Sequence, residues 1–241
     1  MYIPELLGDS EQTKSVYVTF AGASNNYSFN EQMRWTSSFQ ETEYFEFTPE
    51  RCYLHVSGIT NITSPLDLQR YRFVAPVNSD KEIDYPMVFA YQDYKSCVGE
   101  SQMDSIITHK QYCELFVTVH DEYFRGDDVI LRVEGRSTGI ELFTLAPVEG
   151  QFAKSKVVGQ EHKVTFILPR QNQNDLLTIS LYINGELQAS AELTEHISQI
   201  GYDWSKEDLD DLKYFFDKLT ISSVLEIKPW GLGEEKEIEI D

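Results

Sequence analysis

The residues that most often do chemistry in proteins are scattered along this chain. No two of its histidines form an HxH or HExxH pair, and no set of histidines and cysteines has the spacing of a complete zinc site. The nucleophile motif GxSxG and the phosphate-binding motifs GxGxxG and Walker A are also missing. The sequence therefore predicts no catalytic residue, no metal ligand and no cofactor. The histidines, which we interpret as exposed or hydrogen-bonded strand residues, are His55, His109, His120, His162 and His196.

Carboxylates are the one catalytic group present in excess, with 40 Asp and Glu side chains. A β-sandwich can hydrolyse glycosides with a dispersed pair of carboxylates, so a hydrolase stays open as a third hypothesis. Asp127-Asp128 and the cluster of Asp208, Asp210 and Asp211 could suggest calcium. Neither has the DxDxDG register with a distal Glu, and we interpret both as helix-capping and loop-solvating groups. We expect no enzymatic activity.

Three short patterns could mark contacts with other molecules. Arg125-Gly126-Asp127 spells an adhesion tripeptide, but such a triplet arises by chance in roughly one chain in twenty of this length. Asn26 and Asn61 each begin a glycosylation acceptor, which requires a eukaryotic secretory route. Aromatic residues could build a sugar-binding platform, although aromatics in β-rich chains more often pack across strands. The platform candidates are Tyr91, Tyr94, Trp204 and Trp230.

The cysteines are too few for a disulfide scaffold, and none forms a CxxC pair. Cys97 and Cys113 lie on neighbouring predicted strands and could form a bridge that leaves Cys52 free. Three buried thiols are the favoured interpretation.

The net charge of −20 at pH 7 repels phosphate backbones, so nucleic acid and anionic lipid are poor partners. No run of about 18 apolar residues is present to span a membrane. Residues 1–8 also lack the charged and apolar regions of a secretion signal. We expect either a cytosolic protein or an exported one whose signal has been removed.

Period-two alternation of β-branched and aromatic residues dominates the chain and predicts an all-β fold. Asn184-Gly185 between two alternating runs is a strong hairpin signal, because a type I′ turn needs positive φ at both central residues. Helix is expected only at Ser28–Arg34 and Ser205–Leu212. The expected strands are Val16–Phe20, Tyr44–Phe47, Tyr53–Ser57, Tyr71–Pro76, Pro86–Tyr91, Leu115–Val119, Val129–Val133, Glu141–Thr144, Val164–Leu168, Thr178–Ile183 and Glu186–Ala191.

Short strands separated by Gly, Asn, Asp and Pro are typical of β-sandwiches. The polar segment Gly99–Ser105 is the best candidate for a linker between two such units. We therefore predict two β-sandwich domains, residues 1–104 and residues 105–241.

The C-terminal half carries the most distinctive pattern. A run from Phe124 to Gly135 is followed by the strand that ends at Pro169-Arg170 and by the Asn-Gly hairpin. The segment Gly201-Tyr202-Asp203-Trp204 then leads into an acidic stretch and a last strand that reaches Trp230. In this order the chain resembles the FimB-type fimbrial anchor subunits of Bacteroidales, within the fimbrillin superfamily.

The resemblance implies two transthyretin-like β-sandwiches in an exported lipoprotein held on the outer face of the outer membrane. It implies no catalytic residue or cofactor, and partners that are other fimbrial subunits joined by β-strand addition. Family members begin with a signal peptide and a lipid-accepting Cys, whereas the first Cys here is Cys52, in a predicted strand. We expect that the chain starts after the lipidated position. We also expect structural roles for Trp204, beneath a turn capped by Asp203, and for Trp230, at the end of the last strand.

The leading hypothesis from the sequence is a structural fimbrial subunit of the anchor or minor type, located at the cell surface and in the fimbrium. The alternative is a surface glycan-binding lipoprotein of the same architecture. A cluster of coplanar exposed aromatic residues would favour that alternative.

Overall fold

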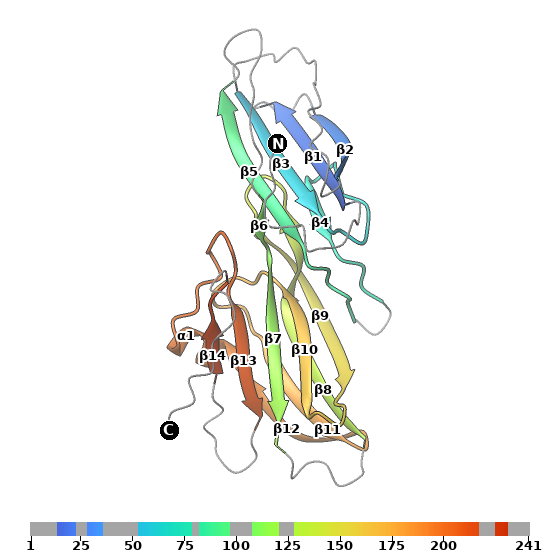
Figure 1. Cartoon of the computed structure of the whole chain (residues 1–241), viewed down its shortest axis with the longest axis vertical. Coiled ribbons are helices and arrows are strands. Elements are labelled where there is room, and N and C mark those ends of the chain that lie inside the picture. The colour runs from blue at the N-terminus through green and yellow to red at the C-terminus, as the bar shows by residue number, and fades with distance from the viewer. Residues whose placement is uncertain are drawn as a thin grey trace.

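The computed structural model describes residues 14–22, 28–35, 53–78, 82–96, 108–120, 128–216 and 225–230. These residues form an elongated all-β molecule with one short helix (Figure 1). The expected strand Tyr44–Phe47 and linker Gly99–Ser105 lie outside the described residues. The prediction of an all-β sandwich fold is confirmed.

One sheet occupies the end of the molecule that carries the N-terminal strands (Figure 1). Its strand order is β2-β1-β3-β5-β6, and every pair in it is antiparallel. Alternating apolar residues such as Ile59 and Ala90, which are partners in the β3–β5 register, are buried. The strands are β1 (Lys14–Gly22), β2 (Ser28–Trp35), β3 (Tyr53–Thr60), β5 (Phe89–Ser96) and β6 (His109–Lys110).

Two further sheets form the other end of the molecule. The first has the order β10-β7-β13-β14, with β13 parallel to β7 and the other pairs antiparallel. Its strands are β7 (Tyr112–Val119), β10 (Lys163–Pro169), β13 (Asp211–Phe216) and β14 (Leu225–Lys228). The second has the order β12-β11-β8-β4, and β9 also pairs with β8. Its strands are β4 (Arg72–Val74), β8 (Val129–Glu141), β9 (Pro147–Val157), β11 (Thr178–Ile183) and β12 (Glu186–Glu192).

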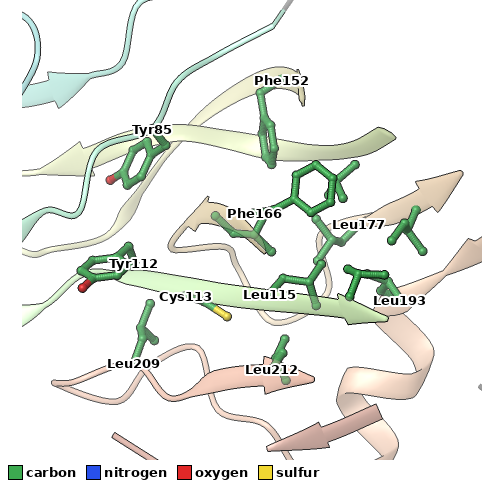
Figure 2. Packing of buried hydrophobic residues seen from close by; sticks show 14 of the residues in the cluster. Tyr85, Tyr112, Cys113, Leu115, Phe152, Phe166, Leu177, Leu193, Leu209 and Leu212 are labelled. Carbon is green, nitrogen blue, oxygen red and sulfur yellow. The ribbon is translucent and has the colours of Figure 1, made fainter. Parts of the chain in front are cut away.

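Aliphatic and aromatic side chains from both of these sheets fill one core. Figure 2 shows Leu115 of β7 and Leu212 of β13 in the same cluster as Phe152 of β9, and Phe166 of β10 lies among them. Tyr85 joins this cluster from the N-terminal half of the sequence. Burial of these apolar surfaces is the main force that holds the sheets together.

The N-terminal half also contributes backbone pairing to the second of these sheets. β4 pairs with the end of β8, so that Phe73 lies opposite Ile140 and Val74 opposite Gly139. Glu82 forms a parallel bridge with Ala153 of β9. Segments before residue 104 therefore complete a sheet whose other strands all lie beyond it. The division into domains 1–104 and 105–241 stays a prediction.

Three predicted elements are wrong. Ser28–Arg34 is not helical, because it forms the β2 ladder with β1. Ser205–Leu212 is also not helical, and the side chains of Asp208 and Asp211 instead bond to Lys110, as described below. Residues 142–144 form a turn instead of a strand, because the chain reverses there to join β8 to β9, and the Leu145 amide donates to the Glu141 carbonyl, 2.9 Å.

Three elements were not predicted, namely α1 (Leu193–Gln199), β9 and β13, the last of which begins where a helix up to Leu212 was expected. The helix α1 has only two buried apolar residues, Leu193 and Ile197, which is a weak periodic signal. β9 has irregular pairing with β8, with register shifts on both sides of Ser137, so its alternation is also weak.

The predicted Asn184-Gly185 hairpin is confirmed. It joins β11 to β12, and both turn residues have positive φ, 50° for Asn184 and 82° for Gly185. The side chain of Asn184 also accepts a hydrogen bond from the Asp128 amide, 3.2 Å.

Replacing Gly185 by Ala is expected to lower the free energy of unfolding by about 1–2 kcal/mol, because a Cβ atom disfavours the left-handed conformation. The measurement is a urea titration followed by circular dichroism. The control is Asn184→Asp, which keeps a side-chain acceptor and tolerates positive φ, and should leave the midpoint nearly unchanged. Equal midpoints for the Gly185→Ala and wild-type chains would contradict the assignment of the turn.

Candidate assembly edge and polar clasp

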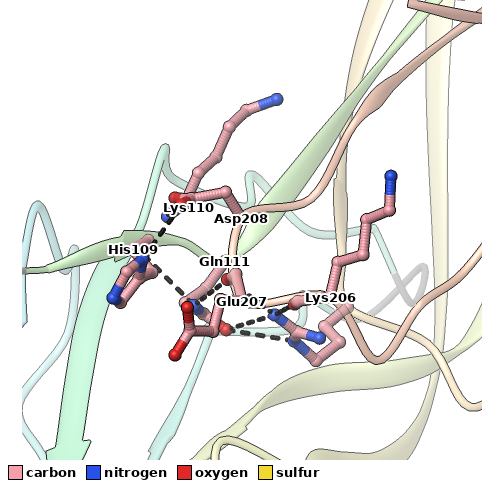
Figure 3. Close-up of polar contacts among 7 residues, drawn as sticks. His109, Lys110, Gln111, Lys206, Glu207 and Asp208 are labelled. Atoms are coloured by element: carbon pink, nitrogen blue, oxygen red, sulfur yellow. Dashed lines mark hydrogen bonds and ion pairs between the residues drawn. The ribbon is translucent and has the colours of Figure 1, made fainter. Parts of the chain in front are cut away.

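The distinctive acidic segment of the C-terminal half folds over the start of β7. Figure 3 shows this contact, which we call the polar clasp and define as His109, Lys110, Gln111, Arg170 and the segment 203–211. Its bonds from His109 and Lys110 to the segment 203–211 join residues that are about 100 positions apart in the sequence. It therefore fixes the connection between β6 and β7 to the loop that precedes β13.

Lys110 is the centre of the clasp and is fully buried. Its ammonium group donates to the Asp211 carboxylate and to the Leu209 carbonyl, 3.1 Å. It also lies 4.7 Å from the centroid of the Tyr112 ring and 4.6 Å from that of Trp230. Ion pairing, hydrogen bonds and two aromatic faces together compensate the loss of water around this charge.

Arg170 forms the second half of the clasp. Its guanidinium donates to Gln111 Oε1 at 3.0 and 2.7 Å, to the Lys206 carbonyl at 2.7 Å and to the Trp204 carbonyl. The Gln111 amide in turn donates to the Glu207 carbonyl, 3.0 Å. Burial lowers the pKa of Arg170, although a guanidinium with so many acceptors keeps its proton at neutral pH. Arg170 also donates to the Glu207 carbonyl, 3.3 Å, so the planar fork of arginine holds three backbone carbonyls of one loop.

The structural roles expected for the marker residues are confirmed. Asp203 Oδ1 accepts from the backbone and hydroxyl of Ser205, at 2.8 and 2.6 Å, and these bonds lower the pKa of Asp203. Trp204 is only 4% exposed. Trp230 follows the last strand, and its amide donates to Asp210, 3.0 Å.

The acidic cluster serves the protein itself. Asp208 bonds to His109 Nδ1 at 2.9 Å and to the Lys110 amide at 2.7 Å, while Asp210 bonds to Lys206, 2.5 Å. Asp211 also accepts from the Glu114 amide, 2.8 Å. In the described part of the chain, no group of three His, Cys, Asp or Glu side chains is arranged to hold a metal ion. Asp127 and the tripeptide Arg125-Gly126-Asp127 lie outside the described residues.

The four aromatic candidates do not form one sugar-binding platform. Trp204 is buried in the clasp, where it contacts Tyr202. Tyr94 is 49% exposed and packs on the His55 ring, with centroids 4.7 Å apart. Tyr91 bonds to Asp93 through its hydroxyl, 3.1 Å. The burial of Trp204 agrees with the interpretation that aromatic residues of this chain pack against other strands and loops.

The remaining singled-out residues have ordinary structural contacts. Cys113 is a free thiol in the core, and burial raises its pKa to about 12. This agrees with the buried-thiol interpretation for Cys113, whereas Cys52 and Cys97 lie outside the described residues. The Asn61 side chain donates to the Met87 carbonyl, 3.0 Å, and Asn26 is outside the described residues.

Two sheet edges near each other are covered by side chains or short segments. At β9, Ile83 donates to the Ala153 carbonyl at 3.0 Å and Ser155 donates to the Glu82 side chain at 3.1 Å. At β10, the Lys156 ammonium donates a hydrogen bond to the Thr165 carbonyl, 2.6 Å. Charged lysines and short covering segments are common ways to block edge pairing.

The outer edge of β12 differs from these edges. In the described part of the chain, no strand pairs with the side of β12 that faces away from β11. We call this side the β12 edge and define it by Glu186–Glu192. All seven of its residues are exposed or partly exposed, and Leu187 is 57% exposed. A strand of this length with free main-chain groups can accept another extended segment.

The register shows which amides form the β12 edge. Leu193 donates to the Leu177 carbonyl, 2.8 Å, and Ala191 is the register partner of Ile179. Hydrogen-bonding direction alternates along an antiparallel strand, so Leu193 and Ala191 point to β11 and Ser190 points away from it. The Ser190 amide is therefore a donor on the open side.

The sheets and their order place the chain in the class of elongated all-β sandwich proteins. No protein-family model matches the sequence, and comparison with curated proteins gives no significant match. Among solved structures, the chain is similar to a candidate polysaccharide-binding protein of Bacteroides thetaiotaomicron, with a TM-score of 0.63, 9% identity and coverage of 89% of this chain and 88% of that chain.

The fimbrial anchor protein Mfa2 of Porphyromonas gingivalis is also similar, with a TM-score of 0.57 and 12% identity. The match covers 92% of this chain and 91% of Mfa2. A candidate cell adhesion protein of Bacteroides uniformis gives a TM-score of 0.52 at 11% identity, over 92% and 93% of the two chains. The predicted resemblance to fimbrial anchor proteins is thus confirmed at the level of the fold.

Proposed function

We propose that this chain is a structural fimbrial subunit of the bacterial cell surface, of the anchor or minor type. The observation that carries this proposal is the likeness in fold to a fimbrial anchor protein over about nine tenths of both chains. The clasp supports a structural role, because its charged residues bond to one another and to backbone carbonyls. We infer a non-enzymatic protein.

Assembly would occur by β-strand addition at the β12 edge. A strand from another fimbrial subunit would gain main-chain hydrogen bonds along Glu186–Glu192, and alternate side chains would set its register. The acidic residues at both ends of β12 would favour a partner strand with basic flanks.

The proposed location of this subunit is the outer face of the outer membrane. The chain would be held at the outer membrane by a covalently attached lipid, with the two predicted domains, 1–104 and 105–241, projecting outward. The described part of the chain has no helix long and apolar enough to cross a membrane. The net charge of −20 would keep such an exposed surface hydrated.

The substitution Ser190→Pro tests the β12 edge. Proline removes the outward amide but leaves the ladder to β11 intact, so strand addition should fail while the chain stays folded. In cells that produce each variant as the sole copy, we expect fimbriae to be released or changed in length, as measured by electron microscopy and by sedimentation of shed fimbriae.

The matched control is Ser190→Ala. It keeps the amide but removes the hydroxyl that bonds to Ser180 Oγ, 3.0 Å, so it should preserve attachment. Identical fimbriae with Ser190→Pro and wild type would reject the β12 edge. Identical fimbriae after deletion of the whole gene would reject the fimbrial role itself.

A further inference from the structure

A groove with a volume of about 340 Å³ lies on the face of the sheet formed by β10, β7, β13 and β14. This face points away from the core, and neither the clasp nor the β12 edge uses it. The residues that matter for its chemistry are Phe116, Lys163, Lys213, Phe215, Glu226 and Lys228. None of them is a candidate site residue predicted from the sequence.

Strand pairing places the aromatic and cationic residues next to one another. Phe116 of β7 lies opposite Lys213 of β13, and Phe215 lies opposite Thr118. On the other side of β7, Lys163 of β10 is the partner of Thr118. Two phenylalanine rings on the open face are thus flanked by lysines from neighbouring strands.

The groove is locally cationic on a strongly acidic chain. Lys228 places its ammonium 4.9 Å from the centroid of the Phe116 ring. Among the described residues, neither Lys163 nor Lys228 forms an ion pair. Glu226 is the one acidic residue of the lining. Glu114, two residues before Phe116 on β7, is close enough to Lys228 for their charges to interact. At physiological ionic strength charges are screened beyond about 8 Å, so a ligand in the groove meets the three lysines and these two carboxylates more strongly than the remaining acids of the chain.

The position of the groove restricts what can bind there. β7 is paired on both sides by β10 and β13, and β13 on both sides by β7 and β14. Their main-chain groups are already used, so a peptide strand would gain no ladder of hydrogen bonds. A suitable ligand must bind through aromatic faces and side-chain charges alone, which favours a rigid ring with one apolar face and an anionic group.

We propose that this groove binds a carboxylated oligosaccharide of the uronic-acid class. An apolar sugar face would pack on Phe215, and carboxylates would meet Lys163 and Lys228. These two lysines are three strands apart, about 14 Å across the sheet, and four residues apart along the strands, about 13 Å, so they fit an oligomer with more than one carboxylate. This site is independent of the proposed fimbrial role.

The test is calorimetric titration of the purified chain with oligogalacturonate at low salt. Binding should weaken at least tenfold in the Lys163→Ala/Lys228→Ala double variant and several-fold in Phe215→Leu. The control is Lys154→Ala. Lys154 lies on β9, outside the sheet that carries the groove, and pairs with Asp84, so this variant should bind like wild type. Raising the salt concentration should also weaken binding.

Four results would overturn the proposal. They are no heat of binding at millimolar oligogalacturonate, equal binding by its methyl-esterified neutral form, and tighter binding of a sulfated heparin oligosaccharide. The fourth is tighter binding of a peptide with the acidic sequence of residues 234–241, which would make the groove a site for an acidic peptide. Thermal melting of each variant verifies that lost binding is not lost folding.

Discussion

Replacing Lys110 by Met is expected to lower the free energy of unfolding by about 3–5 kcal/mol, the range for removal of one partner from a buried ion pair. The substitution nearly preserves side-chain volume but leaves the Asp211 carboxylate in the core with the Glu114 amide as its remaining donor in the clasp. It also leaves the Leu209 carbonyl without its lysine donor. Urea unfolding followed by circular dichroism measures the change.

Lys206→Met is the matched control. Lys206 pairs with Asp210, but the lysine side chain is 51% exposed, so loss of this bridge should change the stability by less than about 1 kcal/mol. The double variant Lys110→Met/Asp211→Asn should recover part of the loss, because the asparagine keeps an acceptor for Glu114 and carries no charge. If Lys110→Met and Lys206→Met were equally stable, the clasp would not be a source of stability.

The sequence pattern could predict the structure where the decisive interactions are local. The Asn184-Gly185 turn depends on two adjacent residues, and the alternation of Thr178–Ile183 identifies its own strand. The segment Ser205–Leu212 has the local signals of a helix, a serine and early acidic residues. Two of its acids, Asp208 and Asp211, instead bond to His109 and Lys110, about 100 positions away, which no local pattern contains.

The candidate sites could likewise be predicted where they depend on local residues, and not where they depend on residues far apart in the sequence. Asp203 and Trp204 could be assigned structural roles because a turn and a large apolar residue are visible in the sequence. The β12 edge could not be identified, since an edge exists only once the order of strands is known. The cationic groove depends on the parallel pairing of β13 with β7, which joins residues nearly 100 positions apart. The sequence could predict strands, but not which strands would be neighbours.

Substitution of Gly139, at the contact between β4 and β8, is expected to have a second large effect on stability. A Cβ atom at Gly139 would lie 1.9 Å from the Phe73 carbonyl oxygen, and this obstacle is backbone. Gly139→Ala must therefore displace β4 from β8, and we expect a loss of about 3 kcal/mol, at the upper end of overpacking effects. The pairing of Phe73 with Ile140, both fully buried, should open with it.

Gly159→Ala is the control, because a Cβ atom at Gly159 would meet no atom within 4 Å. Its stability should lie within about 0.5 kcal/mol of wild type. Hydrogen exchange adds a local readout, since the Ala75 amide donates to the Thr138 carbonyl, 2.9 Å, just beyond the paired residues. Its protection should fall in Gly139→Ala and persist in Gly159→Ala. Unchanged protection in both variants would contradict β4 as the strand that joins the N-terminal half to this sheet.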